Sequence, residues 1–185
     1  GVDLAVATDH NHITDYAPVV ATLPPNTALT TIVGDEITSS GDDLYGHFNA
    51  FPLAPGSGVF EEGLPPYYGA VPREVFEGAR SKGARFVQVN HARMPPRIGY
   101  FDLTHFDAAT GKADAKFADG FDVVEAWNGI WLSKPERAME SLRDIVGLAR
   151  RGIRVAVTGN SDSHRMYIEE AGYPRTYLRV AREPR

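Results

Sequence analysis

The stretch from Ile153 to His164 constrains the fold of this chain more than any other segment. Val155 and Val157 alternate with less apolar neighbours, as in a β-strand, and the strand pattern stops in a polar turn. That turn carries Asp162 two residues before His164, so the two side chains point the same way if the backbone stays extended. A carboxylate and an imidazole on one side suit a divalent metal such as Zn²⁺, Mn²⁺ or Fe²⁺, although many such pairs only cap a helix or decorate a turn.

Four other segments with strand character also carry a carboxylate or an imidazole at or beside their ends. They are residues 1–8 with Asp9 and His10, 29–33 with Glu36, 46–51 with His47, and 85–90 with His91. Because the carboxyl ends of parallel strands meet at one edge of a sheet, where ligands bind, this repetition predicts a single metal site. The predicted metal ligands are His10, Glu36, His47, His91, Asp162 and His164. For His12 and His105, which stand in loops, a surface role is the simpler interpretation.

Two helical segments alternate with the later strands. Residues 71–82 bring Val75, Phe76 and Ala79 to one face, and residues 133–151 carry a longer apolar stripe. That stripe consists of Ala138, Leu142, Ile145, Val146 and Ala149. Strands that alternate with helices predict an α/β fold with a mostly parallel sheet, either open or closed into a barrel. A length of 185 residues fits a single domain that spans residues 1–185.

Composition narrows the chemistry and the partners of such a protein. The chain has no cysteine, so disulfides and thiolate ligands are excluded and a metal must rest on histidine, aspartate and glutamate. A net charge of −5 without a run of lysine or arginine gives no reason to expect nucleic acid as a partner. No apolar segment approaches the length of a membrane span and no signal peptide is visible, so we expect a soluble protein. The expected partner is a small-molecule substrate. The compartment and the oligomeric state stay open.

Five short motifs follow one another along the chain: Thr8–Asn11, Gly34–Thr38, Gly46–Asn49, Asn90–His91 and Gly159–His164. In this order they resemble the motifs of PHP-domain metallohydrolases, the polymerase and histidinol phosphatase superfamily. The segment Gly172–Tyr177, which follows the last motif, looks like the subgroup that contains the carbaryl hydrolases. The resemblance extends over nearly the whole chain.

The resemblance implies a distorted (β/α)₇ barrel, similar to a TIM barrel, whose strand ends hold two or three divalent metal ions. It implies that Glu36, His47 and His91 bind one ion, and that Glu36 bridges to a second ion that also binds Asp162. The implied reaction is hydrolysis, in which a water held by the metals becomes a hydroxide near neutral pH.

The resemblance also implies catalytic roles for three residues near the ends of the chain. His10 and His164 would belong to a third metal position. Asp9 would orient His10 or a metal-held water. The alternative for Asp9 is a carboxylate that only caps the following turn.

The start of the chain departs from the superfamily pattern. Superfamily members begin with a strand that ends in His-x-His, and no such pair precedes Gly1. We therefore expect an N-terminally truncated barrel. The missing pair normally completes the metal position shared by Glu36 and Asp162. We therefore expect a metal ion to bind best at the position of Glu36, His47 and His91, and we expect slow hydrolysis.

The leading function predicted from the sequence is a metal-dependent phosphoesterase. The subgroup likeness makes an amide, carbamate or ester substrate the first alternative, and a metal-binding but inactive module is the second. Arginines near the motifs could bind an anionic part of the substrate, although exposed arginines more often serve solubility. These arginines are Arg93, Arg97, Arg165 and Arg175.

Overall fold

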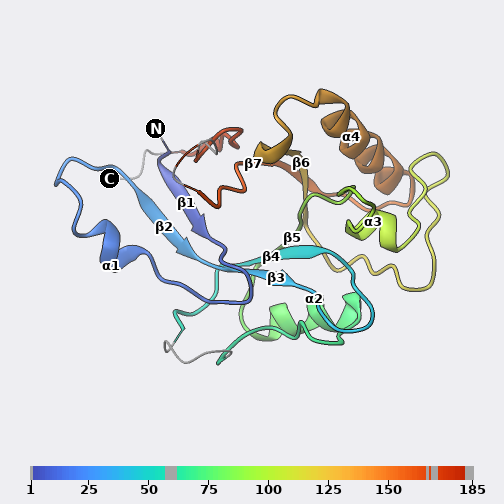
Figure 1. The fold of residues 1–185 in the computed structure, drawn as a ribbon, viewed down its shortest axis with the longest axis horizontal. Coiled ribbons are helices and arrows are strands. Elements are labelled where there is room, and N and C mark those ends of the chain that lie inside the picture. The colour runs from blue at the N-terminus through green and yellow to red at the C-terminus, as the bar shows by residue number, and fades with distance from the viewer. Residues whose placement is uncertain (1, 57–61, 166, 168–170, 182–185) are drawn as a thin grey trace.

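The computed structural model describes residues 2–56, 62–165, 167 and 171–181. Along these residues lie seven strands, four α-helices and one short 3₁₀ helix (Figure 1). Their bounds are β1 Leu4–Ala7, α1 Ala17–Val20, β2 Thr30–Val33, β3 Asp35–Thr38, β4 His47–Phe51, α2 Pro72–Ser81, β5 Phe86–Val89, α3 Tyr100–Leu103, β6 Val123–Asn128, the 3₁₀ helix Gly129–Trp131, α4 Pro135–Arg150 and β7 Ala156–Asn160.

The strands form two sheets. β1 and β2 pair in parallel as a two-stranded sheet, with α1 beside it at the opposite end of the molecule from α4 (Figure 1). The other strands form a five-stranded sheet in the order β3-β4-β5-β6-β7. Within this sheet β3, β4 and β5 are antiparallel neighbours, whereas β5, β6 and β7 run parallel. The larger sheet is therefore mixed.

The predicted (β/α)₇ barrel is wrong, because the described strands form two sheets and do not close into a barrel. A parallel barrel needs a crossover of a dozen or more residues, usually helical, between consecutive strands. The connection from β2 to β3 is a single residue, Gly34, and the connection from β3 to β4 is the loop 39–46. The short loop 39–46 reverses the direction of the chain, so β4 runs antiparallel to β3. Among the described elements, helices of ten residues or more separate strands only after β4, where α2 precedes β5 and α4 precedes β7.

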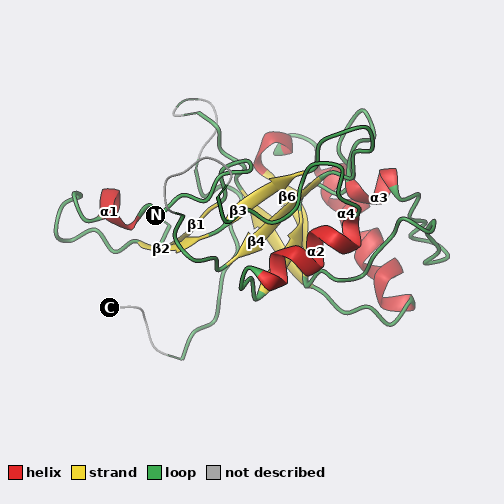
Figure 2. Ribbon diagram, turned by 90° about the horizontal axis from the view of Figure 1, so that it is seen from below, coloured by secondary structure: helices red, strands yellow, loops and turns green. Residues whose placement is uncertain are grey.

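A cluster of aromatic side chains packs between the antiparallel strands and the helix α2, which crosses one face of the sheet (Figure 2). The ring of Phe48 on β4 lies edge-on to Phe76 of α2 and to Tyr100 of α3, with ring centroids 5.0 and 5.3 Å apart. The Tyr100 hydroxyl donates to the carbonyl of Ala118 and accepts from its N–H, so its burial leaves no polar atom unpaired. This core fixes β4, and with it His47 at the first position of that strand.

The helix α4 has the predicted position but buries a different face from the predicted one. Leu142 and Val146 of the predicted apolar stripe are 43% and 51% exposed. The residues that the helix buries are Ser141, Asp144, Gly147 and Leu148. The close approach of the loop at Ala108 explains Gly147, where an added Cβ would lie 2.7 Å from the Ala108 backbone. In the described part of the chain, no helix combines the length and the apolar character that a membrane span requires.

Candidate metal centre

Polar side chains from four segments meet where the two sheets join. His10, which follows β1, forms an isolated parallel bridge with Glu36 of β3, and this bridge connects the two sheets. His47 opens β4 opposite Thr38, and His91 follows the end of β5. Because β4 runs antiparallel to both neighbours, its first residue lies beside the ends of β3 and β5. The mixed sheet thus brings these residues to one end, although His47 begins its strand.

Glu36 lies at the centre of this cluster. Its Oε1 atom is 3.1 Å from His47 Nδ1 and 4.0 Å from His91 Nε2, and its Oε2 atom is 4.0 Å from His10 Nε2. His10, Glu36 and His47 each offer a ligand atom within 4.8 Å of the other two. Oε1 is buried and accepts no hydrogen bond of adequate geometry. The carboxylate therefore faces imidazoles on both sides while one of its oxygen atoms stays unpaired.

His91 approaches Glu36 from the β5 side. Its Nε2 atom lies 2.9 Å from His47 Nδ1. On the other side of the ring, Nδ1 lies 3.4 Å from Glu125 Oε2 and 3.9 Å from Asp162 Oδ2, yet it is buried without a hydrogen bond. The backbone of His91 has φ of 27°, a conformation that residues other than glycine rarely adopt. The chain thus turns sharply as soon as β5 ends.

The structure adds Glu125 of β6, which the sequence pattern did not select as a site residue. It is 3% exposed and accepts hydrogen bonds from the backbone N–H of His91 at 2.7 Å and from the side-chain amides of Asn128 and Asn160 at 3.1 and 3.0 Å. These three partners lie at or just after the ends of β5, β6 and β7, so one carboxylate ties three strand ends together. The sequence did contain a signal for this residue, because Glu125 is a carboxylate inside an otherwise apolar strand and a buried charge needs partners.

His164 and Asp162 border the cluster on the β7 side. His164 Nε2 is 3.3 Å from His10 Nε2, and the two rings stack with centroids 5.5 Å apart. His10 Nδ1 lies 2.5 Å from the hydroxyl of Thr38. Asp162 Oδ2 accepts a hydrogen bond from Asn128 at 2.9 Å. The side chains of His10 and His164 are 40% and 46% exposed, so they form the solvent-facing edge of the cluster.

The electrostatics of the cluster follow from burial and close charge pairs. Burial by itself would raise the pKa of Glu36, but the approach of His47 and the neighbouring imidazoles outweighs it and holds the pKa below its usual range. Burial would lower the pKa of His91, and Glu125 with the nearby carboxylates raises it above its usual range instead. Next to Glu36, burial and the negative neighbours raise the pKa of Asp35 to about 7.

The other residues predicted for the site have partners or exposures of their own. The carboxylate of Asp9 accepts a hydrogen bond from the hydroxyl of Tyr16 at 2.9 Å. Arg165 and Arg175 are exposed in the segment after β7. His12 is exposed, and His105 pairs with Asp114 at 3.0 Å on the surface.

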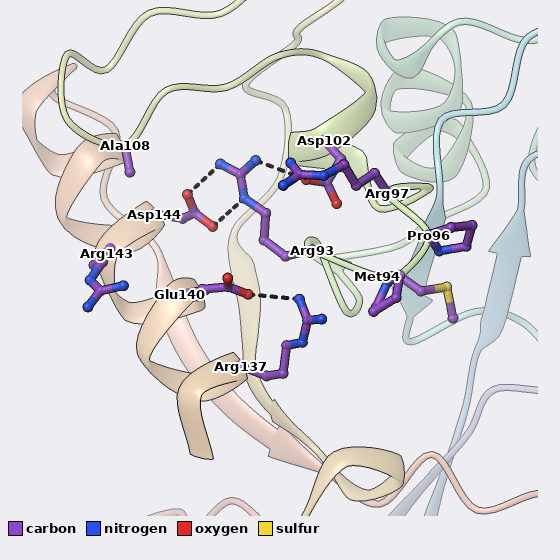
Figure 3. Close-up of a pocket in the computed structure, with 11 residues that line it drawn as sticks. Arg93, Met94, Pro96, Arg97, Asp102, Ala108, Arg137, Glu140, Arg143 and Asp144 are labelled. Atoms are coloured by element: carbon purple, nitrogen blue, oxygen red, sulfur yellow. Dashed lines mark hydrogen bonds and ion pairs between the residues drawn. The ribbon is translucent and has the colours of Figure 1, made fainter. Parts of the chain in front are cut away.

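Arg93 extends to α4 and α3 and not to the histidines (Figure 3). Its guanidinium forms a two-bond pair with Asp144 at 2.7 and 2.9 Å, a third bond to Asp102 at 3.2 Å and a fourth to the carbonyl of Phe106 at 2.6 Å. These bonds occupy the guanidinium. Arg93 therefore stabilises the fold and has little capacity left for a substrate.

The donor set fits a divalent metal ion. Imidazole nitrogen and carboxylate oxygen are ligands that Zn²⁺, Mn²⁺ and Fe²⁺ accept. Bonds of about 2.0–2.1 Å at tetrahedral angles place two ligand atoms roughly 3.3 Å apart. His47 Nδ1 lies 2.9 Å from His91 Nε2 and 3.1 Å from Glu36 Oε1, and the third pair, His91 Nε2 and Glu36 Oε1, is 4.0 Å apart, so the three distances lie on both sides of this value. The unpaired Glu36 Oε1 atom borders the same space. An ion there would give this oxygen the partner that it lacks.

No family model, curated protein or solved structure matches this chain. What the cluster can do chemically must therefore be inferred from its own geometry. That geometry consists of a buried carboxylate between imidazoles, with two further histidines at the solvent edge.

Proposed function

We propose that this chain is a divalent-metal-dependent hydrolase, with phosphoesters as the leading substrate class. In this proposal Glu36, His47 and His91 would hold the first ion, and Glu36 with His10 would hold a second. The order of the sequence motifs, which resembles that of PHP-domain metallohydrolases, supports phosphoesters. The segment that looks like the carbaryl hydrolases supports carbamate and ester substrates as the alternative.

The observation that carries the proposal is the buried Glu36 carboxylate, whose Oε1 atom lies 3.1 Å from His47 Nδ1 and 4.0 Å from His91 Nε2 but has no hydrogen bond of adequate geometry from the described residues. Leaving a buried acceptor without a hydrogen bond costs about 1–3 kcal/mol, and more for a charged group. A cluster that served only to hold the fold together would be expected to pair this atom, as Arg93 and Asp144 pair theirs. A cation bound between the imidazoles and the carboxylate would offset this cost.

The side chains around this position have separate tasks. When bound, a divalent ion supplies a Lewis acid and lowers the pKa of a water that it holds. Glu125 holds the turn at His91 through its backbone N–H, and Thr38 orients His10 through a 2.5 Å contact. His164, whose Nε2 atom lies 3.3 Å from that of His10 at the solvent edge, would pass a proton to the leaving group.

Metal analysis combined with turnover tests this proposal. After loading with Zn²⁺, Mn²⁺ or Fe²⁺ and removal of excess ion, we expect bound metal in the wild type and in His105→Ala, whose surface histidine is the matched control. His47→Ala and His91→Ala should lose it. Hydrolysis of bis(p-nitrophenyl) phosphate and p-nitrophenyl phosphate is then compared with that of p-nitrophenyl acetate and an aryl carbamate.

The outcomes distinguish three candidate functions: a phosphoesterase, an ester or carbamate hydrolase, and a metal-binding module without activity. Metal-dependent release of nitrophenol from the phosphoesters supports the leading proposal, and preference for the acetate or the carbamate supports the alternative. Bound metal without turnover of any of these compounds would show a metal-binding module that is not a hydrolase. If His47→Ala binds as much metal as His105→Ala, the assigned site is wrong.

A further inference from the structure

A second feature of the structure has no role in the metal centre. A cavity of about 440 Å³ lies between the segment Arg93–Arg97 and the helix α4 (Figure 3). None of the six predicted metal ligands lines it. Its charged lining comprises four arginines and three carboxylates, which are Arg93, Arg97, Arg137, Arg143, Asp102, Glu140 and Asp144. The lining therefore has one positive charge in excess.

The carboxylates of this cavity already have cationic partners. Both oxygen atoms of Asp144 accept hydrogen bonds from Arg93. Asp102 accepts a third bond from Arg93 and lies 3.7 Å from Arg97. The Oε2 atom of Glu140 accepts from the Nη1 atom of Arg137 at 3.0 Å. The negative groups of the lining are thus neutralised, so they do not favour a metal cation.

The hydrogen-bonding capacity that remains in the cavity consists mainly of donors. Among the described side chains, three buried polar atoms have no hydrogen-bond partner: Glu36 Oε1, His91 Nδ1 and Arg137 Nε. The first two belong to the metal centre, and the third belongs to Arg137, a residue that lines this cavity. Figure 3 shows Arg137 extending from α4 toward the Met94 segment. Arg97, whose side chain is 85% exposed, pairs with Asp102 only at 3.7 Å and keeps its donors available.

We propose that this cavity is a binding site for an oxyanion, a phosphate or a carboxylate group, with Arg137 and Arg97 as its donors. A planar guanidinium offers parallel N–H groups that match two oxygen atoms of such an anion. An anion between the guanidinium groups of Arg137 and Arg97 would neutralise the excess positive charge of the lining. Met94, Pro95 and Pro96 form the uncharged side of the same cavity. The site does not depend on the proposed hydrolase function.

Titration with simple anions, followed by ¹H–¹⁵N NMR, tests this site directly. The Nε–H signal of Arg137, identified by its loss in Arg137→Lys, reports on the atom that lacks a partner. Inorganic phosphate and acetate are added separately in the presence of a chelator, so that no metal ion can bind the anion. We expect a saturable shift of this signal with at least one of the two. Tighter binding of phosphate would assign the cavity to phosphoryl groups, and tighter binding of acetate to carboxylates.

Variants decide whether the two arginines bind the anion. Arg137→Ala should weaken binding at least about 10-fold, the loss expected when a charge-assisted hydrogen bond is removed. Arg97→Ala should weaken it by a smaller factor and also serves if Arg137→Ala does not fold. The matched control is Arg73→Ala, which removes an exposed arginine of α2 and should bind like the wild type.

Three results would overturn the proposal. The first is the absence of a saturable shift with both phosphate and acetate. The second is wild-type affinity in both Arg137→Ala and Arg97→Ala. The third is loss of binding in His47→Ala, which would place the anion at the histidine cluster. Wild-type anion binding in His47→Ala, together with loss of metal binding in that variant, would show that the two sites are separate.

Discussion

Two clusters of charged side chains lie on either side of the segment that follows β5, and they differ in how completely their atoms are paired. Arg93 makes four hydrogen bonds, and both oxygen atoms of its partner Asp144 are occupied. His91, two residues earlier in the chain, keeps a buried Nδ1 atom without a hydrogen bond, and its neighbour Glu36 keeps an unpaired Oε1 atom. A cluster whose atoms are hydrogen-bonded can stabilise the fold by itself, whereas one with unsatisfied atoms leaves donors and acceptors for a ligand.

The difference also shows in how each cluster handles a buried carboxylate. Asp144 is 2% exposed and lies against the permanent positive charge of Arg93. Asp35 is 1% exposed and lies beside Glu36. Its carboxylate accepts a hydrogen bond from the backbone N–H of His12. Burial raises the pKa of both carboxyl groups, but Arg93 offsets part of this effect at Asp144, so the larger cost to stability falls on the histidine side. Four predictions test this contrast, from the largest expected effect to the smallest.

Replacing Arg93 with alanine should cause the largest loss of stability. The change leaves Asp144 and Asp102 buried without their cation, and breaking a buried ion pair in this way costs about 3–5 kcal/mol. The free energy of unfolding from urea denaturation measures the effect. The matched control is Arg97→Ala, whose exposed arginine pairs with the same Asp102 and should cost less than about 1 kcal/mol. Equal losses in the two variants would contradict the contrast.

Replacing Asp35 with asparagine should stabilise the metal-free protein at high pH. Burial raises the pKa of this carboxyl to about 7, so the folded state holds a proton that the unfolded state has released. The contribution of the protonated Asp35 to stability is therefore fully present below the pKa that this carboxyl has in the unfolded state. It is lost as the pH rises to about 7. Each pKa unit corresponds to about 1.4 kcal/mol, which bounds the loss at roughly 4 kcal/mol. Asparagine keeps the acceptor for the His12 N–H without the charge.

The measurement is the free energy of unfolding at about pH 5 and about pH 8 with a chelator present. The advantage of Asp35→Asn should be larger at the higher pH. Asp107 provides a control without pH dependence in this range, because hydrogen bonds from Thr110 and Ala109 hold its pKa below its usual range. Its contribution is present above the usual pKa and is lost as the pH falls. A wild type whose stability does not decline between these pH values would show that Asp35 has a partner at that site.

Replacing Glu125 with glutamine should weaken metal binding about 10–100-fold, as expected when a side chain that orients a metal ligand is changed. The glutamine amide would place a donor against the N–H groups of His91, Asn128 and Asn160, which all donate to Glu125 in the wild type. Competition with a chelator of known affinity measures the change. Glu140→Gln, which removes a carboxylate of the arginine cluster, is the control and should retain the metal affinity of the wild type.

Replacing His105 with alanine should have the smallest effect. Its side chain is 80% exposed and its 3.0 Å contact with Asp114 lies at the surface, where such pairs contribute about 0–1 kcal/mol. Metal content should not change. A clear loss of bound metal would mean that this loop histidine takes part in the site and that the histidine cluster is incomplete as described.

Local sequence patterns were sufficient to locate most of the elements. The helix expected at residues 71–82 occurs as α2, Pro72–Ser81, because Val75, Phe76 and Ala79 repeat at helical spacing and Gly83 follows. The strand expected at 85–90 occurs as β5, Phe86–Val89. The polar segment that contains Asp35 and Glu36 was not predicted as a strand, and it forms β3 because it pairs with β4.

The pairing of the strands and the buried face of α4 depended on the tertiary structure. Alternation shows that a segment is extended, but the partner and direction of a strand depend on contacts far along the chain. This is why a barrel was predicted where a mixed, open sheet exists. The apolar stripe through Leu142 and Val146 was expected inside, yet α4 buries Asp144 because Arg93 reaches it from a position 51 residues away.

The sequence by itself determined which residue types could hold a metal, since without cysteine only histidine and carboxylates remain, and it placed them at or beside strands. Only the tertiary structure decided that His10, Glu36, His47 and His91 meet at the junction of the two sheets, that Glu125 supports them, and that Arg93 belongs elsewhere. The physical reason is range. Side-chain chemistry and strand or helix periodicity are local properties, whereas the pairing of a buried charge depends on residues that folding brings together from distant segments.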